Sequence, residues 1–137
     1  MNKVIRVLIG KVGLDGHEVG ARVVAKVLSN AGMEVIYTGL RQTPEMIVRA
    51  ALEEDVDLIG VSILSGAHMS FLPEILHLLK QYNAEDIPLI AGGIIPPEDY
   101  PALKQLGVKG LFPPDTPTAE IVKFVKHLLK LPTTNNQ

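Results

Sequence analysis

Apolar runs alternate with amphipathic stretches along the chain. The apolar runs are short, rich in Val, Ile and Leu, and lack a regular apolar-polar alternation. This pattern is typical of strands that are buried on both faces of a parallel sheet. We expect such strands at 4–10, 34–37, 57–63, 88–91 and 109–112, and helices between them at 17–31, 44–54, 70–82, 97–106 and 117–130.

Residues at the expected helix ends support these boundaries. Thr43 and Thr116 each precede a proline, so that a capping hydroxyl would stand before a first-turn proline. Gly32 and Gly107 follow two of the expected helices, where glycine commonly ends a helix. The caps therefore agree with the apolar pattern.

Five strand-then-helix units predict an α/β fold with right-handed crossovers. We expect a flavodoxin-like (Rossmann-like), doubly wound, five-stranded parallel sheet in the order 2-1-3-4-5, with helices on both faces. We expect one domain over residues 1–131. The polar segment 132–137 is expected to be a disordered tail.

Composition narrows the classes of function. A chain of 137 residues with a formal net charge of −2 does not resemble a basic, nucleic-acid-binding domain. There is no cysteine, which excludes disulfides, thiol nucleophiles and Cys-type zinc sites. No apolar run approaches the ~20 residues of a membrane-spanning helix, and we find no signal-peptide pattern. We expect a soluble, cytoplasmic protein without a membrane partner.

The expected topology also predicts where a ligand binds. In open parallel sheets, ligands bind beyond the carboxyl ends of the strands, where the strand order reverses. That point lies between the first and third strands, so the loops after Gly10 and Ile63 should form the site. Glycine is dense on this edge, which permits close approach of a backbone to a ligand.

The first of these loops contains Asp15-Gly16-His17. One interpretation is a capping turn with an exposed histidine. The other is a metal site in which His17 is the ligand, Asp15 accepts a hydrogen bond from its remote ring nitrogen, and Lys11 holds Asp15 ionised. A single histidine is a poor zinc site, but it suffices when a macrocycle supplies the other ligands.

Three separated motifs resemble one known signature. D-G-H-E-V-G at 15–20, S-I-L at 62–64 and G-G at 92–93 are separated by 41 residues (21–61) and 27 residues (65–91). They resemble the D-x-H-x-x-G, S-x-L and G-G signature of the base-off, histidine-on cobalamin-binding domain. The resemblance extends from about residue 6 to 128 and is greatest to the adenosylcobalamin-dependent acyl-CoA mutases, the methylmalonyl-CoA mutase group.

The resemblance implies roles for residues of the first motif. His17 would be the lower axial ligand of the cobalamin cobalt, replacing the dimethylbenzimidazole base. Asp15 would accept a hydrogen bond from His17, and Lys11 would complete the relay. Gly16 and Gly20 would leave the backbone unobstructed beside the corrin and the nucleotide tail, although turn geometry or helix packing could equally explain Gly20.

The other motifs would hold the nucleotide tail. By the same resemblance, Ser62 would hydrogen-bond the displaced benzimidazole, and Leu64 would pack on the tail unless it is a core residue. Gly92 and Gly93 would let the tail pass, or would simply form a turn. Weaker candidates on the same edge are Thr38, Gly39 and Thr116. His68 also lies on this edge, where we favour a helix-start role.

One turn departs from the mutase pattern. Many methylmalonyl-CoA mutases carry a G-P-G-T-like turn after the fifth strand, where this chain has Pro113-Pro114-Asp115 followed by Thr116-Pro117. The D-T-P form resembles the small subunit of 2-hydroxyisobutyryl-CoA mutase. The departure leaves open whether this turn contacts the nucleotide tail and which acyl-CoA is the substrate.

The resemblance implies the cofactor subunit of an isomerase. The chain is about half of a typical ~250-residue TIM barrel, so we expect a large acyl-CoA-binding barrel subunit as partner, in a heterotetramer. The implied reaction is the adenosylcobalamin-dependent radical 1,2-rearrangement of a short branched acyl-CoA, of the 2-hydroxyisobutyryl or methylmalonyl type. Alternatives are a corrinoid methyl carrier and a free-standing cobalamin chaperone or sensor. A signalling receiver domain is disfavoured, because Gly10 and Ser62 stand where it needs acidic residues.

Overall fold

The computed structural model describes residues 4–11, 19–39, 41–63 and 68–130. Its strands are β1 (Arg6–Lys11), β2 (Glu34–Tyr37), β3 (Leu58–Ile63), β4 (Leu89–Gly93) and β5 (Gly110–Phe112). Its helices are α1 (Val19–Asn30), α2 (Pro44–Glu54), α3 (His68–Gln81), α4 (Tyr100–Leu106) and α5 (Thr118–Leu128), and a 3₁₀ turn, η1 (Pro97–Asp99), precedes α4. Each expected strand and helix is therefore present.

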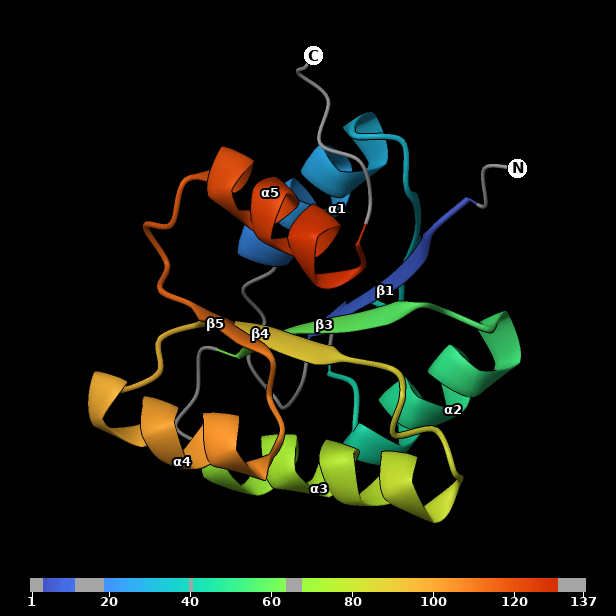
Figure 1. The fold of residues 1–137 in the computed structure, drawn as a ribbon, viewed down its shortest axis with the longest axis vertical. Helices are drawn as coiled ribbons and strands as arrows, with labels where there is room; N and C mark the ends of the chain where they lie inside the picture. Colours follow the sequence, from blue (N-terminus) through green and yellow to red (C-terminus); the bar gives the residue numbers. More distant parts are fainter. Residues whose placement is uncertain (1–3, 12–18, 40, 64–67, 131–137) are drawn as a thin grey trace.

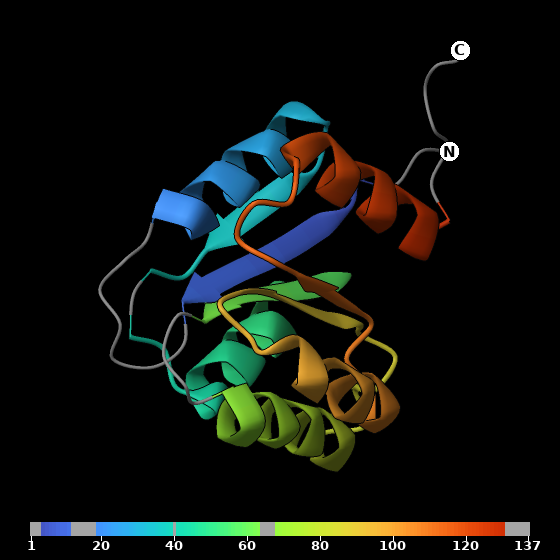
Figure 2. The ribbon, with the colours of Figure 1, turned by 90° about the vertical axis from the view of Figure 1, so that its left-hand side faces the viewer.

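The strands form one parallel sheet in the order β2-β1-β3-β4-β5. Helices α1 and α5 cover one face, and α2, α3 and α4 cover the other (Figure 1). Figure 2 shows the same three layers from the side. The predicted flavodoxin-like, doubly wound architecture is confirmed. Its switch point lies between β1 and β3, as expected.

The expected helix 97–106 is divided into η1 and α4. Pro101 lacks the N–H that a continuous α-helix would donate to the carbonyl of Pro97. The Tyr100 N–H donates to that carbonyl instead, which is the tighter hydrogen bond of a 3₁₀ turn. The expectation of one uninterrupted helix was wrong because it neglected this missing donor.

Two helix caps differ in outcome. The Thr43 hydroxyl accepts a hydrogen bond from the Met46 N–H at 3.1 Å, so the predicted cap of α2 is confirmed. The predicted Thr116 cap is wrong, because the residue before α5 is Pro117 and no side chain caps it. The Thr116 hydroxyl donates instead to the Pro113 carbonyl at 2.7 Å, which closes the turn after β5.

The sheet separates two apolar clusters. Leu8 and Ile59 belong to the cluster under α2, α3 and α4, whereas Ile9 and Leu58 belong to the cluster under α1 and α5. Successive residues of a strand point to opposite faces, so each buried strand supplies both clusters. This explains why the strands lack apolar-polar alternation in the sequence.

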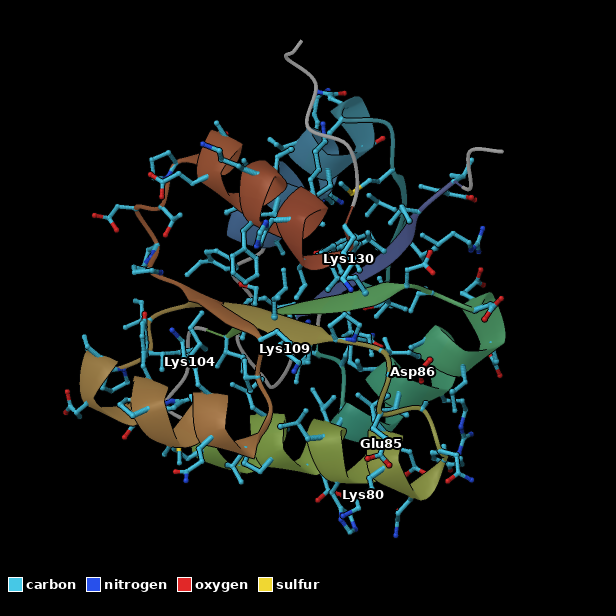
Figure 3. The ribbon with its side chains drawn as sticks, viewed as in Figure 1. Lys80, Glu85, Asp86, Lys104, Lys109 and Lys130 are labelled. Carbon is cyan, nitrogen blue, oxygen red and sulfur yellow. The ribbon has the colours of Figure 1, made fainter. Side chains whose placement is uncertain are left out.

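The amino edge of the sheet is charged with both signs. Glu85 and Asp86 precede β4, Lys109 precedes β5, and Lys80 lies near the end of α3 (Figure 3). In the described part of the chain, no helix is long and apolar enough to cross a membrane.

Candidate functional site

A cavity of about 410 Å³ lies between the sheet and the helices α1 and α5. Its lining comes from the carboxyl halves of β1, β3, β4 and β5, from the first two turns of α1, from the turn between β5 and α5, and from the first turn of α5. The volume is within the ~300–1,000 Å³ usual for small-molecule sites. The lining is mostly aliphatic, with hydroxyls from Ser62, Thr116 and Thr118. The cavity lies at the carboxyl edge of the sheet, where the topology predicts a ligand, whereas residues 12–18 and 64–67 of the two loops expected to form the site lie outside the described residues.

One row of residues, here called the mouth row, crosses the sheet near the carboxyl ends of its strands, and all of its members except Lys11 border the cavity. The strand register pairs Lys11 with Ser62, Ser62 with Gly92, and Gly92 with Phe112. Paired residues of neighbouring strands face the same side of a sheet, and this row faces α1 and α5. The structure therefore brings together Ser62 and Gly92, which the sequence places on separate motifs.

Gly92 and Gly93 have different structural reasons to be glycine. Gly93 has φ +124°, and a Cβ there would collide with the backbone of Ile63, so only glycine fits this position. A Cβ on Gly92 would meet the Phe112 carbonyl oxygen at 3.4 Å, which is nearly an ordinary contact. Gly92 borders the cavity. Backbone conformation and contact therefore require glycine at Gly93, whereas neither requires it at Gly92.

Gly20 lies in the first turn of α1, at the cavity wall. A Cβ built on it meets no heavy atom of the described residues within 4 Å. Glycine within a helix is less favourable than alanine by roughly 0.5–1 kcal/mol, and no packing contact of the described residues requires it here. The helix-packing interpretation of Gly20 is therefore not supported.

Lys11 is the last residue of β1, and its side chain is completely buried. Its backbone N–H donates to the Gly39 carbonyl at 3.2 Å, and its ammonium lies 3.5 Å from the Ser62 carbonyl oxygen. Lysine is almost never fully buried unless it is paired. We expected Lys11 in the loop after Gly10, whereas strand pairing continues through it.

Thr38 and Gly39 lie beside Lys11 and are not among the residues that line the cavity. The Thr38 N–H donates to the Ile9 carbonyl at 2.9 Å, and Gly39 has φ +93°. Both residues hold the end of β1 from the β2 side. Thr116 borders the cavity instead.

Aromatic packing fixes the wall formed by β5. The rings of Phe112 and Phe124 meet edge to face, with centroids 5.2 Å apart. Phe112, Pro113 and Pro114 border the cavity, and the Thr116 hydroxyl closes this turn on Pro113. The turn that departs from the mutase pattern is thus part of the cavity wall.

His68 begins α3, which confirms its predicted helix-start position. The side chain is 7% exposed, and its Nε2 lies 2.7 Å from a carboxylate oxygen of Asp99. Its Nδ1 has no hydrogen-bond partner within the described part of the molecule. The pair joins the connections after β3 and β4. Sequence reasoning missed it, because 31 positions separate the two residues and no motif relates them.

The walls contributed by helices were also missed. Val23 and Val24 face the cavity one turn after Gly20, and Thr118 and Ile121 face it from α5. The spacing of positions 20, 23 and 24 is the spacing of one helix face and was the available signal. The exposure of Val23, 44%, then has an explanation, because its side chain borders a cavity.

Four predicted site residues lie outside the described residues: Asp15, Gly16, His17 and Leu64. The same holds for the expected tail 132–137. Among residues that the structure does describe, no group of three His, Asp or Glu side chains could hold a metal ion. His17 is two positions before α1, the helix that walls the cavity.

The sequence profile of the B12 binding domain family matches residues 5–123. This chain belongs to the B12 binding domain family. The matched residues include all five strands, helices α1 to α4 and the first half of α5. The residues that line the cavity and those of the mouth row therefore all lie within the matched segment.

Relatives place it within the group of acyl-CoA mutase subunits. It is 49% identical to the 2-hydroxyisobutanoyl-CoA mutase small subunit of Aquincola tertiaricarbonis, covering 91% of this chain and 92% of that protein. Identity is 43% to the pivalyl-CoA mutase small subunit of Xanthobacter autotrophicus, covering 90% and 83%. Identity is 42% to the methylmalonyl-CoA mutase of Escherichia coli, where the match covers 90% of this chain but 17% of that enzyme.

Solved structures support the fold alone. A cobalamin-binding protein from Desulfitobacterium hafniense superposes with a TM-score of 0.79 at 21% identity, covering 91% of this chain and 59% of that one. The receiver domain of the response regulator NarL from Mycobacterium tuberculosis superposes at 0.70 and 19% identity, covering 94% and 98%. Since both share the fold, fold similarity does not discriminate between their functions.

Proposed function

We propose that this chain is the cobalamin-carrying small subunit of an adenosylcobalamin-dependent acyl-CoA mutase and that it holds the cofactor base-off, with His17 as the axial ligand of cobalt. The observation that carries the proposal is the cavity between the sheet and α1/α5. Gly20, Ser62 and Gly92 come from three motifs of the cobalamin-binding signature, and all three border this one cavity.

The cavity suits the nucleotide tail of a cobalamin. Its walls are mainly aliphatic and aromatic side chains, which favour burial of a flat, apolar base such as dimethylbenzimidazole. The Ser62 hydroxyl is available at the mouth row to hydrogen-bond a ring nitrogen of the displaced base. Gly20 and Gly92 add no side chains to the walls. The residues present therefore fit the group.

The buried ammonium of Lys11 supports an axial relay. An ammonium inside a protein needs charge compensation and hydrogen bonds, and Lys11 directly precedes the segment that carries Asp15 and His17. In the proposed relay, Lys11 holds Asp15 as a carboxylate, and Asp15 accepts from His17. A carboxylate on the remote nitrogen fixes the imidazole tautomer and raises its basicity as a ligand.

Bound adenosylcobalamin would supply a cobalt-carbon bond whose homolysis starts the radical 1,2-rearrangement of an acyl-CoA. This chain's own residues would bind and orient the cofactor. The apolar walls of the cavity would keep water from the tail, and the row from Lys11 to Phe112 would hold the mouth in place. None of the described residues is assigned to the acyl-CoA itself.

The partner would be a large mutase subunit. The small-subunit relatives are similar to nearly the whole of this chain, whereas the methylmalonyl-CoA mutase match covers 17% of a longer enzyme. We propose that the partner carries an acyl-CoA-binding TIM barrel, that the complex is a cytoplasmic heterotetramer, and that the barrel and the loop edge of this domain enclose the corrin.

For the substrate we propose a short branched acyl-CoA of the 2-hydroxyisobutyryl or methylmalonyl type. The relatives named for 2-hydroxyisobutanoyl-CoA and pivalyl-CoA mutases support branched substrates. The turn Pro113-Pro114-Asp115-Thr116 borders the cofactor cavity at Pro113, Pro114 and Thr116. It can therefore contact the nucleotide tail, while the choice of acyl-CoA would depend mainly on the partner.

Titration with adenosylcobalamin tests the proposal. Wild-type protein should bind it with the absorption spectrum of a base-off, histidine-ligated cobalamin, and His17→Ala should weaken binding and abolish that ligation. An unchanged base-on spectrum, or equal binding by the variant, would contradict the axial-ligand assignment.

Reconstitution with the large subunit, assayed on methylmalonyl-, isobutyryl- and 2-hydroxyisobutyryl-CoA, should give isomerase activity with one of them. Absence of activity with every substrate would contradict the mutase assignment.

A further inference from the structure

A second row of residues lies behind the mouth row, one rung deeper in the sheet. The register pairs Ile9 with Gly60, Gly60 with Ile90, and Ile90 with Gly110. These residues face α1 and α5, because they are two positions before the members of the mouth row on each strand. Two of the four positions in this inner row are glycine.

The two glycines of the inner row differ in what occupies the space above them. A Cβ on Gly110 would lie 2.7 Å from the ring of Phe124, so an aromatic side chain already fills that place. Gly60 borders the cavity. The atoms nearest to a Cβ there are side-chain atoms of its row neighbours, with Ile9 Cδ1 at 2.8 Å and Ile90 Cγ1 at 3.5 Å.

The backbone at Gly60 does not demand glycine. Its φ lies outside the left-handed range, since the glycines with positive φ in the described chain do not include it. The atom nearest to an added Cβ is the far end of the Ile9 side chain rather than a backbone atom. Glycine in a strand interior weakens the strand and often marks a close approach of a ligand. Because Gly60 borders the cavity, a ligand bound there could approach the backbone at Gly60 closely.

We infer that Gly60 sets the depth of the cavity and thereby selects cobamides by the size of their nucleotide base. This inference rests on the proposed function, because it takes the nucleotide tail to be the occupant. The ligand class is a corrinoid whose lower nucleotide ends in a bulky benzimidazole-type base. Gly60 is outside the motifs that resemble the cobalamin-binding signature, and its role here follows from the inner row.

A side chain on Gly60 would shorten the cavity without touching its mouth. An alanine methyl would stand between Ile9 and Ile90, directly below the space that Ser62 and Gly92 open at the next rung. Overpacking by a single added group in a tight site costs about 1–3 kcal/mol, which corresponds to about 5- to 150-fold in affinity. This loss of affinity should affect only ligands that extend into the cavity as far as Gly60.

The test compares Gly60→Ala with wild type on two probes, adenosylcobalamin and adenosylcobinamide, which carries the corrin and the adenosyl group but no nucleotide tail. We expect the variant to bind cobalamin about 5- to 150-fold more weakly and to bind cobinamide as wild type does. Cobinamide binding also reports that the variant is folded, and thermal unfolding followed by circular dichroism checks this independently.

A compensating variant tests whether depth is the cause. Ile9→Val removes the Cδ1 atom nearest to the added methyl and should restore cobalamin binding in the Gly60→Ala background. Equal loss of both ligands, no loss of either, or failure of Ile9→Val to recover cobalamin binding would overturn the inference. If wild-type protein binds neither probe, the proposed function fails instead, so the two failures are distinguishable.

Discussion

Lys11 and Ser62 are direct partners across β1 and β3, and the fully buried Lys11 ammonium lies 3.5 Å from the Ser62 carbonyl oxygen. The two residues lie on the strands that flank the switch point of the sheet. This relationship connects the mouth of the cavity to the segment that carries Asp15 and His17, which follows Lys11 directly in the sequence.

Replacing Lys11 with methionine should weaken cobalamin binding. The thioether fills similar space but removes the charge that, in the proposed relay, keeps Asp15 ionised behind His17. Loss of such an outer partner typically costs ~10- to 100-fold in metal affinity or activity. Adenosylcobalamin titration measures the change. Lys109→Met, at the exposed amino edge, is the matched control and should bind as wild type does. Equal binding by both variants would remove Lys11 from the relay.

Gly20→Ala should change stability and binding in opposite directions. The methyl enters open space at the cavity wall, so the free protein should gain about 0.5–1 kcal/mol of unfolding free energy from helix propensity. The same methyl should obstruct the nucleotide tail and weaken cobalamin binding. Urea unfolding without ligand and cobalamin titration measure the two effects. A variant that is destabilised and binds normally would show that Gly20 serves packing.

His68→Ala should destabilise the fold while the cavity still binds cofactor. The substitution removes a buried ring and leaves the partly exposed Asp99 carboxylate without its partner. Losing a buried hydrogen bond of this kind costs about 1–3 kcal/mol, measurable by chemical denaturation. His77→Ala, on the exposed face of α3, is the control and should stay within about 0.5 kcal/mol of wild type. Equal stability of the two variants would contradict a structural role for the His68–Asp99 pair.

The sequence was sufficient to predict the strands and helices, because buried parallel strands and capped helices leave direct signals. The sheet order followed from the flavodoxin-like fold expected of five such units. Helix α2 was predicted to the residue, since Thr43 and Pro44 define its start. The same reasoning gave a wrong cap at Thr116, because the carbonyl of Pro113 competes for that hydroxyl in the three-dimensional turn. Local capping rules do not include such a competing acceptor.

Other features of the site depend on contacts between strands and were not predictable from spacing. Position 93 must be glycine because a Cβ there would collide with the backbone of Ile63 on the neighbouring strand. The contrast between Gly60 and Gly110 depends on where Phe124 of α5 packs. The motifs predicted that Gly20, Ser62 and Gly92 lie close together, and all three border one cavity. The inner row, the wall formed by α5, and the part of the α1 wall formed by Val23 and Val24 do not appear in the motifs.

Electron paramagnetic resonance of the bound cobalamin in its cobalt(II) form tests the assignment of His17 most directly. The unpaired electron couples to the axial nitrogen, so a ¹⁴N ligand splits each cobalt line into a triplet and a ¹⁵N ligand into a doublet. With uniformly ¹⁵N-labelled protein and unlabelled cobalamin, we predict doublets, which His17→Ala should abolish. Triplets that persist with labelled protein would show that the cofactor's own base remains on cobalt, and would contradict histidine ligation.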